Sequence, residues 1–232
     1  MPSPTRERRD RVDDRRDVFI NCPFSSDYQV NFQAIVFTVV RSGFKPRCAR
    51  ENDDGGEIRL DKICEIIVEC PYSVHDISKT EPDPKSKLPH FNMPFELGLY
   101  LGAKRFGAAA HRSKRTLIFD RDLYRYQSYI SDIAGQDIHA HNEQPSRLIQ
   151  ELANWLRDLA RDPRVPGGAA IAAEFGRFTT DLKRIAAEKQ LELSELTFKD
   201  LGEIAATWVL EESGAPSSRR RRPVKPAPPA AR

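Results

Sequence analysis

The sequence predicts an α/β protein built on a doubly wound parallel sheet of about five strands, followed by a helical hairpin. Short β-rich runs alternate along the chain with longer segments of helical periodicity, which is the order of a parallel sheet with crossover helices. The 232 residues, of which 39% are hydrophobic, suffice for one sizeable core and a smaller appendage. A linker with Pro and Gly then separates this region from two further amphipathic helices.

Five short segments are predicted as strands: DVFINC (17–22), KPRCA (45–49), YSVHDI (72–77), RTLIFD (115–120) and QDIHAH (136–141). The intervening and following segments are predicted as helices: 28–42, 57–70, 94–106, 124–134 and 145–159. The first helix carries valines and an isoleucine at helical spacing and ends at Gly43, where a glycine favours a helix stop. The second helix follows the turn NDDGG, and the last places its leucines on one face.

The chain is expected to divide into four parts. These are a disordered charged N-terminus (1–16), the α/β domain (17–160), the helical hairpin (169–213) and a disordered basic, Pro-rich tail (214–232). The hairpin helices, 169–190 and 197–212, each carry an apolar face. Those faces either dock on the sheet domain or form an oligomer or partner interface, and the sequence leaves both alternatives open.

Composition and charge exclude several functional classes. No apolar run approaches the roughly 18 residues that a membrane span needs, and the charged N-terminus lacks an apolar signal region, so a cytoplasmic location is expected. The four cysteines form no CxxC pair, which favours reduced, packed cysteines over disulfides or zinc ligands. The net charge of +3 depends on the tail, where RRRR is interpreted as a solvated run rather than a nucleic-acid site.

The residues at the ends of the predicted strands are mostly polar, and they lie at the edge where ligands bind in open parallel sheets. They are Asn21, Pro23, Phe24, Ser25 and Ser26 after the first strand, His75, Asp76 and Ser78 after the third, and Asp120 and Asp122 after the fourth. Carboxylates and hydroxyls at such an edge suit a sugar, whose hydroxyl groups need acceptors. No glycine-rich phosphate motif follows the first strand.

Glu96 reaches the same edge from the helix after the third strand, in the segment HFNMPFELGLYLGAKRFG. Its apolar neighbours Phe95 and Leu97 indicate burial, which is unfavourable for a carboxylate unless it is paired or has a chemical task. The alternative is a first-turn acid that complements the helix dipole and accepts free backbone amides. Asp76, likewise, either binds ligand or forms a turn through Ser78.

Other polar and aromatic residues are interpreted structurally. His75 precedes Asp76 on a strand, so its side chain is expected on the opposite face, as a core or rim histidine rather than a general base. His139 and His141 form an HxH pair without a nearby acidic or cysteine partner in the sequence, which disfavours zinc. The tyrosines at positions 124, 126 and 129 are expected to pack rather than to stack on bases.

Several motifs resemble known families. The segments RRDVFINCPFSSDYQVNFQAI, DDGGEIRLDKICEII and YSVHDIS are similar to a Toll/interleukin-receptor (TIR) domain. FINCPF together with MPFELGLYLG resembles the nucleoside 2-deoxyribosyltransferases, whose FELG helix carries a glutamate nucleophile. The resemblance covers about residues 17–135. The sequence lacks the Trp-Cys pair that usually precedes the glutamate of TIR domains. It also differs from the transferases by the insert KTEPDPKSKLPH.

The resemblance implies a flavodoxin-like architecture and chemistry at an N-glycosidic bond. Glu96 matches the catalytic glutamate of both families, and Asp76 matches a position that helps to hold the nucleoside. In bacteria the resemblance is associated with antiphage defence. Cleaving a ribose-to-base bond develops oxocarbenium character at the anomeric carbon, and a carboxylate beneath it stabilises or traps that charge.

The functional expectation is therefore an N-glycosidase or ribosyl-transferring enzyme acting on NAD or on a nucleoside or nucleotide. Glu96 and Asp76 are the expected catalytic residues, without a metal or a cofactor, NAD being a possible substrate. The expected substrate-binding residues are Asn21, Pro23, Phe24, Ser25, Ser78, Asn92 and Met93. The expected partners are a homo-oligomer or a defence-system protein, without nucleic acid or membrane. The alternative is a catalytically silent nucleotide-sensing or assembly module.

Overall fold

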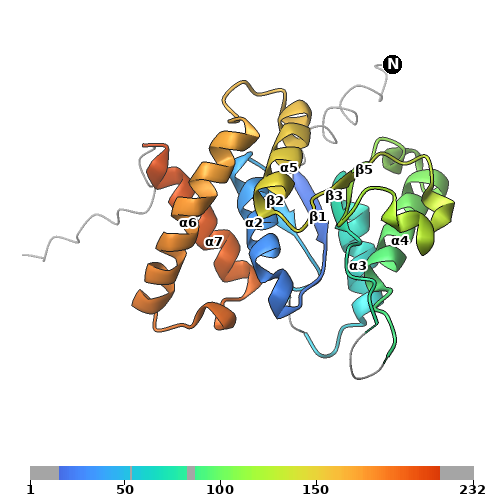
Figure 1. Ribbon diagram of the computed structural model, residues 1–232, viewed down its shortest axis with the longest axis horizontal. Helices are drawn as coiled ribbons and strands as arrows, with labels where there is room; N and C mark the ends of the chain where they lie inside the picture. The colour runs from blue at the N-terminus through green and yellow to red at the C-terminus, as the bar shows by residue number, and fades with distance from the viewer. Residues whose placement is uncertain (1–15, 53, 83–86, 215–232) are drawn as a thin grey trace, which may run out of the picture.

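A computed structural model describes residues 16–52, 54–82 and 87–214 (Figure 1). The ends that the sequence predicts as disordered lie outside the described residues, apart from Arg16 and Gly214. No helix in the described ranges is both long enough and apolar enough to cross a membrane.

The centre of the molecule is a five-stranded sheet in which every neighbouring pair is parallel. Its strands are β1 (Asp17–Asn21), β2 (Lys45–Arg47), β3 (Tyr72–Asp76), β4 (Arg115–Asp120) and β5 (Ile138–Ala140). The spatial order β2-β1-β3-β4-β5 is that of flavodoxin-like folds, which confirms the predicted fold class. The register pairs Asn21 with His75 and Asp76 with Phe119, so these strands end at nearly the same level.

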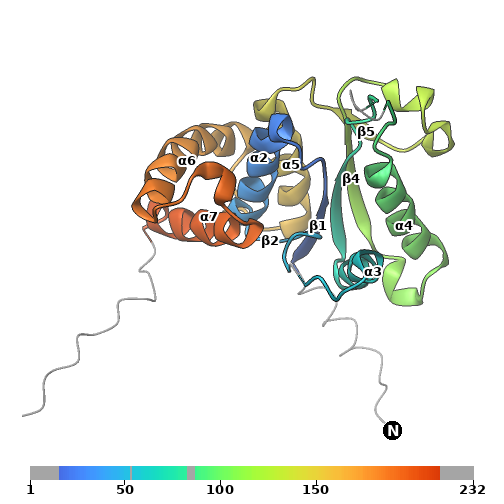
Figure 2. The same ribbon diagram turned by 90° about the horizontal axis from the view of Figure 1, so that it is seen from below.

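Helices cover both faces of the sheet (Figure 2). They are α2 (Gln29–Arg41), α3 (Arg59–Glu69), α4 (Asn92–Phe106), α5 (Pro145–Ala160), α6 (Gly168–Glu188) and α7 (Phe198–Glu212). Helices α2 and α5 lie on one face, and α3 and α4 lie on the other. Alternating apolar residues of the strands feed two cores: Val18 and Val74 join the α2 side, whereas Phe19 joins the α3 and α4 side.

The helix predicted for residues 124–134 is wrong. The segment forms two short 3₁₀ turns, Arg125–Ser128 and Ser131–Ile133, and Tyr124 before them has a left-handed backbone with φ of 62°. Tertiary contacts with the sheet edge explain the difference, because the Tyr129 hydroxyl donates to the Ile77 carbonyl at 3.0 Å. The apolar side chains of the segment pack on Ile77 and Ile118 instead of forming a continuous helical face.

The helical hairpin docks on the sheet domain, the first of the two alternatives left open for its apolar faces. Phe37 of α2 stacks on Phe178 of α6 with ring centroids 4.7 Å apart, and Trp208 of α7 meets Phe37 at 5.6 Å. Trp208 also donates its indole N–H to Asp181 of α6 at 2.9 Å. Because the apolar faces of the hairpin are buried against the sheet domain, they do not support a homo-oligomer. The expectation of a homo-oligomer stays a prediction.

Helix α2 is the most enclosed helix of this arrangement. Its eight consecutive residues from 32 to 39 are all buried. The sheet lies on one side of it, while α5, α6 and α7 pack around the others (Figures 1 and 2). The Arg41 guanidinium pairs with Glu174 at 2.5 Å and ties α2 to α6 at its C-terminal end.

The cysteines are free thiols. Cys22, Cys48 and Cys70 are buried in the core segments in which the sequence places them, and Cys64 is exposed on α3. Burial raises the pKa of the Cys48 and Cys70 thiols to about 12, so both are protonated and chemically quiet.

Candidate functional site

Glu96 lies on α4, close to the carboxyl edge of the sheet. Because α4 begins at Asn92, Glu96 is its fifth residue and lies beyond the first turn. Its side chain is buried, with 5% exposure. Among the described residues, no hydrogen-bond donor or cation pairs with its carboxylate.

This environment argues against the helix-dipole interpretation of Glu96. A dipole-complementing acid accepts free N–H groups in the first turn, and no residue of that turn donates to Glu96. Burial instead raises the pKa of the Glu96 carboxyl to about 7, and the charge of Arg59 opposes that rise in part. The carboxyl is thus held between its two protonation states near neutral pH.

Asn21, at the end of β1, holds the start of α4. Its side-chain N–H group donates to the Met93 carbonyl oxygen at 2.9 Å, and its Nδ2 lies 2.9 Å from His75 Nδ1. Both Asn21 and Met93 are buried, with exposed fractions of 2% and 9%. These two predicted substrate-binding residues therefore contact each other, and their contact fixes the part of α4 that carries Glu96.

His75 points away from Asp76, as the strand alternation predicts. Its ring packs between Phe19 and Tyr100, on the α3 and α4 side of the sheet. Complete burial lowers the pKa of His75 to about 3, so the ring stays neutral. It is a core histidine that supports Asn21.

Asp76, at the end of β3, is fully enclosed rather than open to a ligand. The Tyr28 hydroxyl donates to Oδ2, the Ser78 N–H group donates to Oδ1 at 2.9 Å, and His141 Nε2 lies 3.1 Å from Oδ2. Burial would raise the pKa of Asp76, but His141, Ser78 and Tyr28 together hold it below its ordinary value. Asp76 thus forms the predicted turn with Ser78 and also the centre of a buried polar network.

The tautomer of His141 follows from its other contact. The Glu143 N–H group donates to His141 Nδ1 at 3.0 Å, so Nδ1 is the unprotonated nitrogen and Nε2 carries the hydrogen. His141 Nε2 lies 3.1 Å from the Asp76 carboxylate without the geometry of a hydrogen bond, and His139 instead faces Glu151 at 3.1 Å. The two histidines of the HxH pair therefore have separate acidic partners. The expectation of no acidic partner nearby in the sequence is wrong for His139, because Asp137, two positions earlier, lies 3.9 Å from its Nε2.

The strand β4 ends in a second enclosed carboxylate, Asp120. It accepts from the Tyr129 hydroxyl at 3.0 Å and from the Arg121 N–H group at 2.7 Å, and it pairs with Arg125 at 3.2 Å. Arg125 also donates to the Ser78 carbonyl and to Thr80. This network joins the loops after β3 and β4 and sets their relative position.

The remaining predicted binding residues vary in exposure. Pro23 and Ser78 are buried, Phe24 is half-buried, and Ser25 and Asn92 are exposed. The Cys22 thiol lies in electrostatic range of both carboxylates: burial raises its pKa most, and Asp76 and Glu96 add to the rise. Glu96 and Asp76 are thus neighbours on one edge, with only Glu96 lacking partners.

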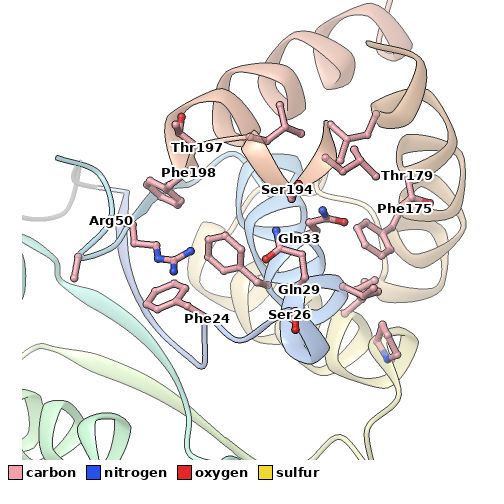
Figure 3. A pocket seen from close by; sticks show the side chains of 18 of the residues that line it. Phe24, Ser26, Gln29, Gln33, Arg50, Phe175, Thr179, Ser194, Thr197 and Phe198 are labelled. Atoms are coloured by element: carbon pink, nitrogen blue, oxygen red, sulfur yellow. The ribbon is translucent and has the colours of Figure 1, made fainter. Parts of the chain in front are cut away.

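A cavity of about 1300 Å³ opens beside this edge (Figure 3). Phe24, from the loop after β1, and Arg59, at the start of α3, belong to its lining. Neither Glu96 nor Asp76 lines it, and it extends instead between α2 and the hairpin. Arg59 is the link between the two regions, since its charge acts on Glu96.

Sequence reasoning missed several members of the site. Tyr28, His141 and Arg59 are distant in sequence from the carboxylates that they contact or influence. No local pattern marks them, since their roles follow from the order of the strands. In the described ranges, no group of three or more acidic, histidine or cysteine side chains is arranged to hold a metal ion. Comparisons of the chain with protein-family models, with curated proteins and with solved structures found no match.

Proposed function

We propose that this protein cleaves the N-glycosidic bond of a nucleoside, a nucleotide or NAD, by hydrolysis or by ribosyl transfer, with Glu96 acting on the anomeric carbon. The observation that carries the proposal is the Glu96 carboxylate itself, which is buried and has no partner among the described residues at the ligand-binding edge of a flavodoxin-like sheet. Antiphage defence is the setting that the sequence resemblance suggests.

The chemistry needs an anion that is free to meet a developing cation. As the bond between the anomeric carbon and the base nitrogen breaks, the base leaves with the electron pair and the sugar gains oxocarbenium character. Glu96 has no competing hydrogen bond, so its charge is available to stabilise that centre or to form an ester with it. Water or an acceptor hydroxyl then adds at the anomeric carbon and releases a proton.

Asp76 supports this site in an indirect role. Its carboxylate is sealed by Tyr28, Ser78 and His141, so it does not present an oxygen to sugar hydroxyls. It holds the loop after β3 in place, and we assign it as a positioning residue.

The test is base release by matched variants. Purified protein is incubated with NAD and with a panel of nucleosides and nucleotides, and free base is measured by chromatography. Glu96→Gln keeps the shape but loses the charge, and it should lower the rate by about 100-fold or more. Glu65→Gln, on the exposed face of α3, is the control and should act like the wild type. Equal rates in Glu96→Gln and wild type would refute the catalytic assignment.

A catalytically silent nucleotide-binding module is the second candidate. The sealed state of Asp76 favours it, because the Asp76 carboxylate is not open to activate water beside Glu96. Binding of a nucleotide without release of base from any panel member would identify this function instead.

A further inference from the structure

The cavity between α2 and the hairpin is large enough to hold a small-molecule ligand. Its volume of about 1300 Å³ exceeds the roughly 300–1,000 Å³ of typical small-molecule pockets. Its walls come from α2, from α6 and from the segment Leu193–Phe198 that leads into α7 (Figure 3). Because Glu96 does not line it, its occupant is a question separate from the chemistry at Glu96.

Gln33 supplies a polar group on the floor of the cavity. Its side chain has 8% exposure and, among the described residues, neither donates nor accepts a hydrogen bond. Gln29 lies one helical turn before it, and Figure 3 shows both amides directed into the space below Ser194. Neither atom of the Gln33 amide is fully enclosed, so both are free to meet a donor and an acceptor on a ligand in the cavity.

Aromatic rings form the sides of the same cavity. Phe24 and Phe32 meet edge to face with ring centroids 5.3 Å apart, and Phe32 is 6.1 Å from Phe198. Phe175 lines the opposite wall, from α6. Flat apolar walls suit a planar heteroaromatic ring. The Gln33 amide offers a donor and an acceptor for hydrogen bonds to the edge of such a ring.

The charged residues that line the cavity are mainly basic. Four basic residues line it, Arg50, Arg59, Lys62 and Lys183, against the two acids Asp54 and Glu57. Lys62 is paired with Glu57, but the other three have no carboxylate within ion-pair distance in the described parts of the chain. The Arg50 guanidinium lies over the Phe24 ring at 4.4 Å, which holds one cation beside the aromatic wall. An anionic group on the ligand is therefore favoured.

We propose that this cavity is a nucleotide site, in which the base lies between the phenylalanines with its edge on Gln33 and the phosphate lies near Arg50. The ligand is either a free mononucleotide or the remote half of a dinucleotide. The site does not depend on bond cleavage at Glu96.

Calorimetric titration of the full chain with four mononucleotides, AMP, GMP, CMP and UMP, tests the proposal. At least one should bind, and ribose 5-phosphate, which lacks the base, should bind at least tenfold more weakly. Gln33→Leu should weaken the bound nucleotide about tenfold or more, since the ring edge loses its partner. Gln136→Leu makes the same change at an exposed loop position and should have no effect, and Glu96→Gln should bind like the wild type.

Ser194→Trp gives a second variant that does not alter the core. Ser194 is exposed on the rim, so an indole there enters the cavity mouth without removing a buried side chain, and it should also weaken binding. Titration of NAD into Glu96→Gln separates the two ligand sources. Competition with the mononucleotide indicates a dinucleotide site, and simultaneous binding indicates a free mononucleotide. Absence of binding by all four mononucleotides, or unchanged affinity in both cavity variants, would overturn the proposal.

Discussion

The buried Glu96 carboxyl lowers the stability of the fold when it is ionised, and the same ionised form is the one that we propose acts on the substrate. Its pKa is raised from 4.5 to about 7, so between these values the folded state binds more protons than the unfolded state, and stability falls as the pH rises. Glu96→Gln removes this cost, and its stability relative to wild type should increase by about 2 kcal/mol from pH 5 to pH 8. Base release by the wild type should change in the opposite direction and rise through pH 7, because the ionised form acts. Urea unfolding and initial rates at both pH values measure the two effects, and a pH-independent stability difference would contradict the assignment.

The pKa of Asp76 is lowered, so its contribution to stability has the opposite pH dependence. Its carboxylate is held ionised by Tyr28, Ser78 and His141, so its stabilisation is present above the unfolded pKa near 3.8 and is lost on acidification. Asp76→Asn should destabilise the protein by about 1–3 kcal/mol at pH 7, because the partners lose a charged acceptor. Asp132→Asn, at an exposed position, is the control, and thermal unfolding is the measurement. A stable Asp76→Asn protein with weakened sugar binding would show that Asp76 meets the ligand directly.

The sequence identifies Glu96 more fully than Asp76, for a physical reason. The burial of Glu96 is suggested by its own helix, in which Met93, Pro94, Leu97 and Tyr100 are also buried. The surroundings of Asp76 depend on His141, 65 positions later, and on the adjacency of β4 and β5 that brings the loop after β5 to the end of β3. A local pattern contains no information on that contact.

At the scale of elements, a hydrogen bond from the Asn21 side chain joins β1 to the start of α4. Asn21→Ala removes the donor to the Met93 carbonyl, so the first turn of α4 loses its anchor. We expect a loss of about 1–2 kcal/mol in stability and a fall in kcat larger than the change in KM, because Glu96 is displaced while the pocket remains. Asn154→Ala on the exposed face of α5 is the control. An unchanged kcat in a destabilised Asn21→Ala protein would limit Asn21 to a structural role.

Elements with strong periodicity or clear stops could be predicted from the sequence. The wrongly predicted helix at 124–134 shows what limits such a prediction. RTLIFD is found as β4 over its full predicted length. The segment 124–134 has aromatic residues at near-helical spacing, yet Tyr129 and Arg125 bond to the loops and carboxylate at the sheet edge. Those tertiary bonds outweigh the weak helical preference of aromatic residues.

At the scale of the whole molecule, the hairpin completes the core of the sheet domain. Trp208→Ala should destabilise the protein by about 3–5 kcal/mol, since the indole packs on Phe37 and Phe178 and has 5% exposure. Leu210→Ala, on the exposed side of α7, should cost about 0.5 kcal/mol or less. Truncation after Leu159 should yield insoluble protein for the same reason. A soluble, folded truncation product would contradict this account of the core.

The enclosure of α2 has a consequence for biosynthesis. This helix is translated before α6 and α7, but part of the surface that covers it belongs to those two helices, the last of which ends at residue 212. Until α7 has been made, Phe37 and its neighbours face water or other chains. The nascent chain is therefore at its most aggregation-prone while most of its sheet already exists, and its dependence on chaperones is greatest just before translation of the hairpin is finished.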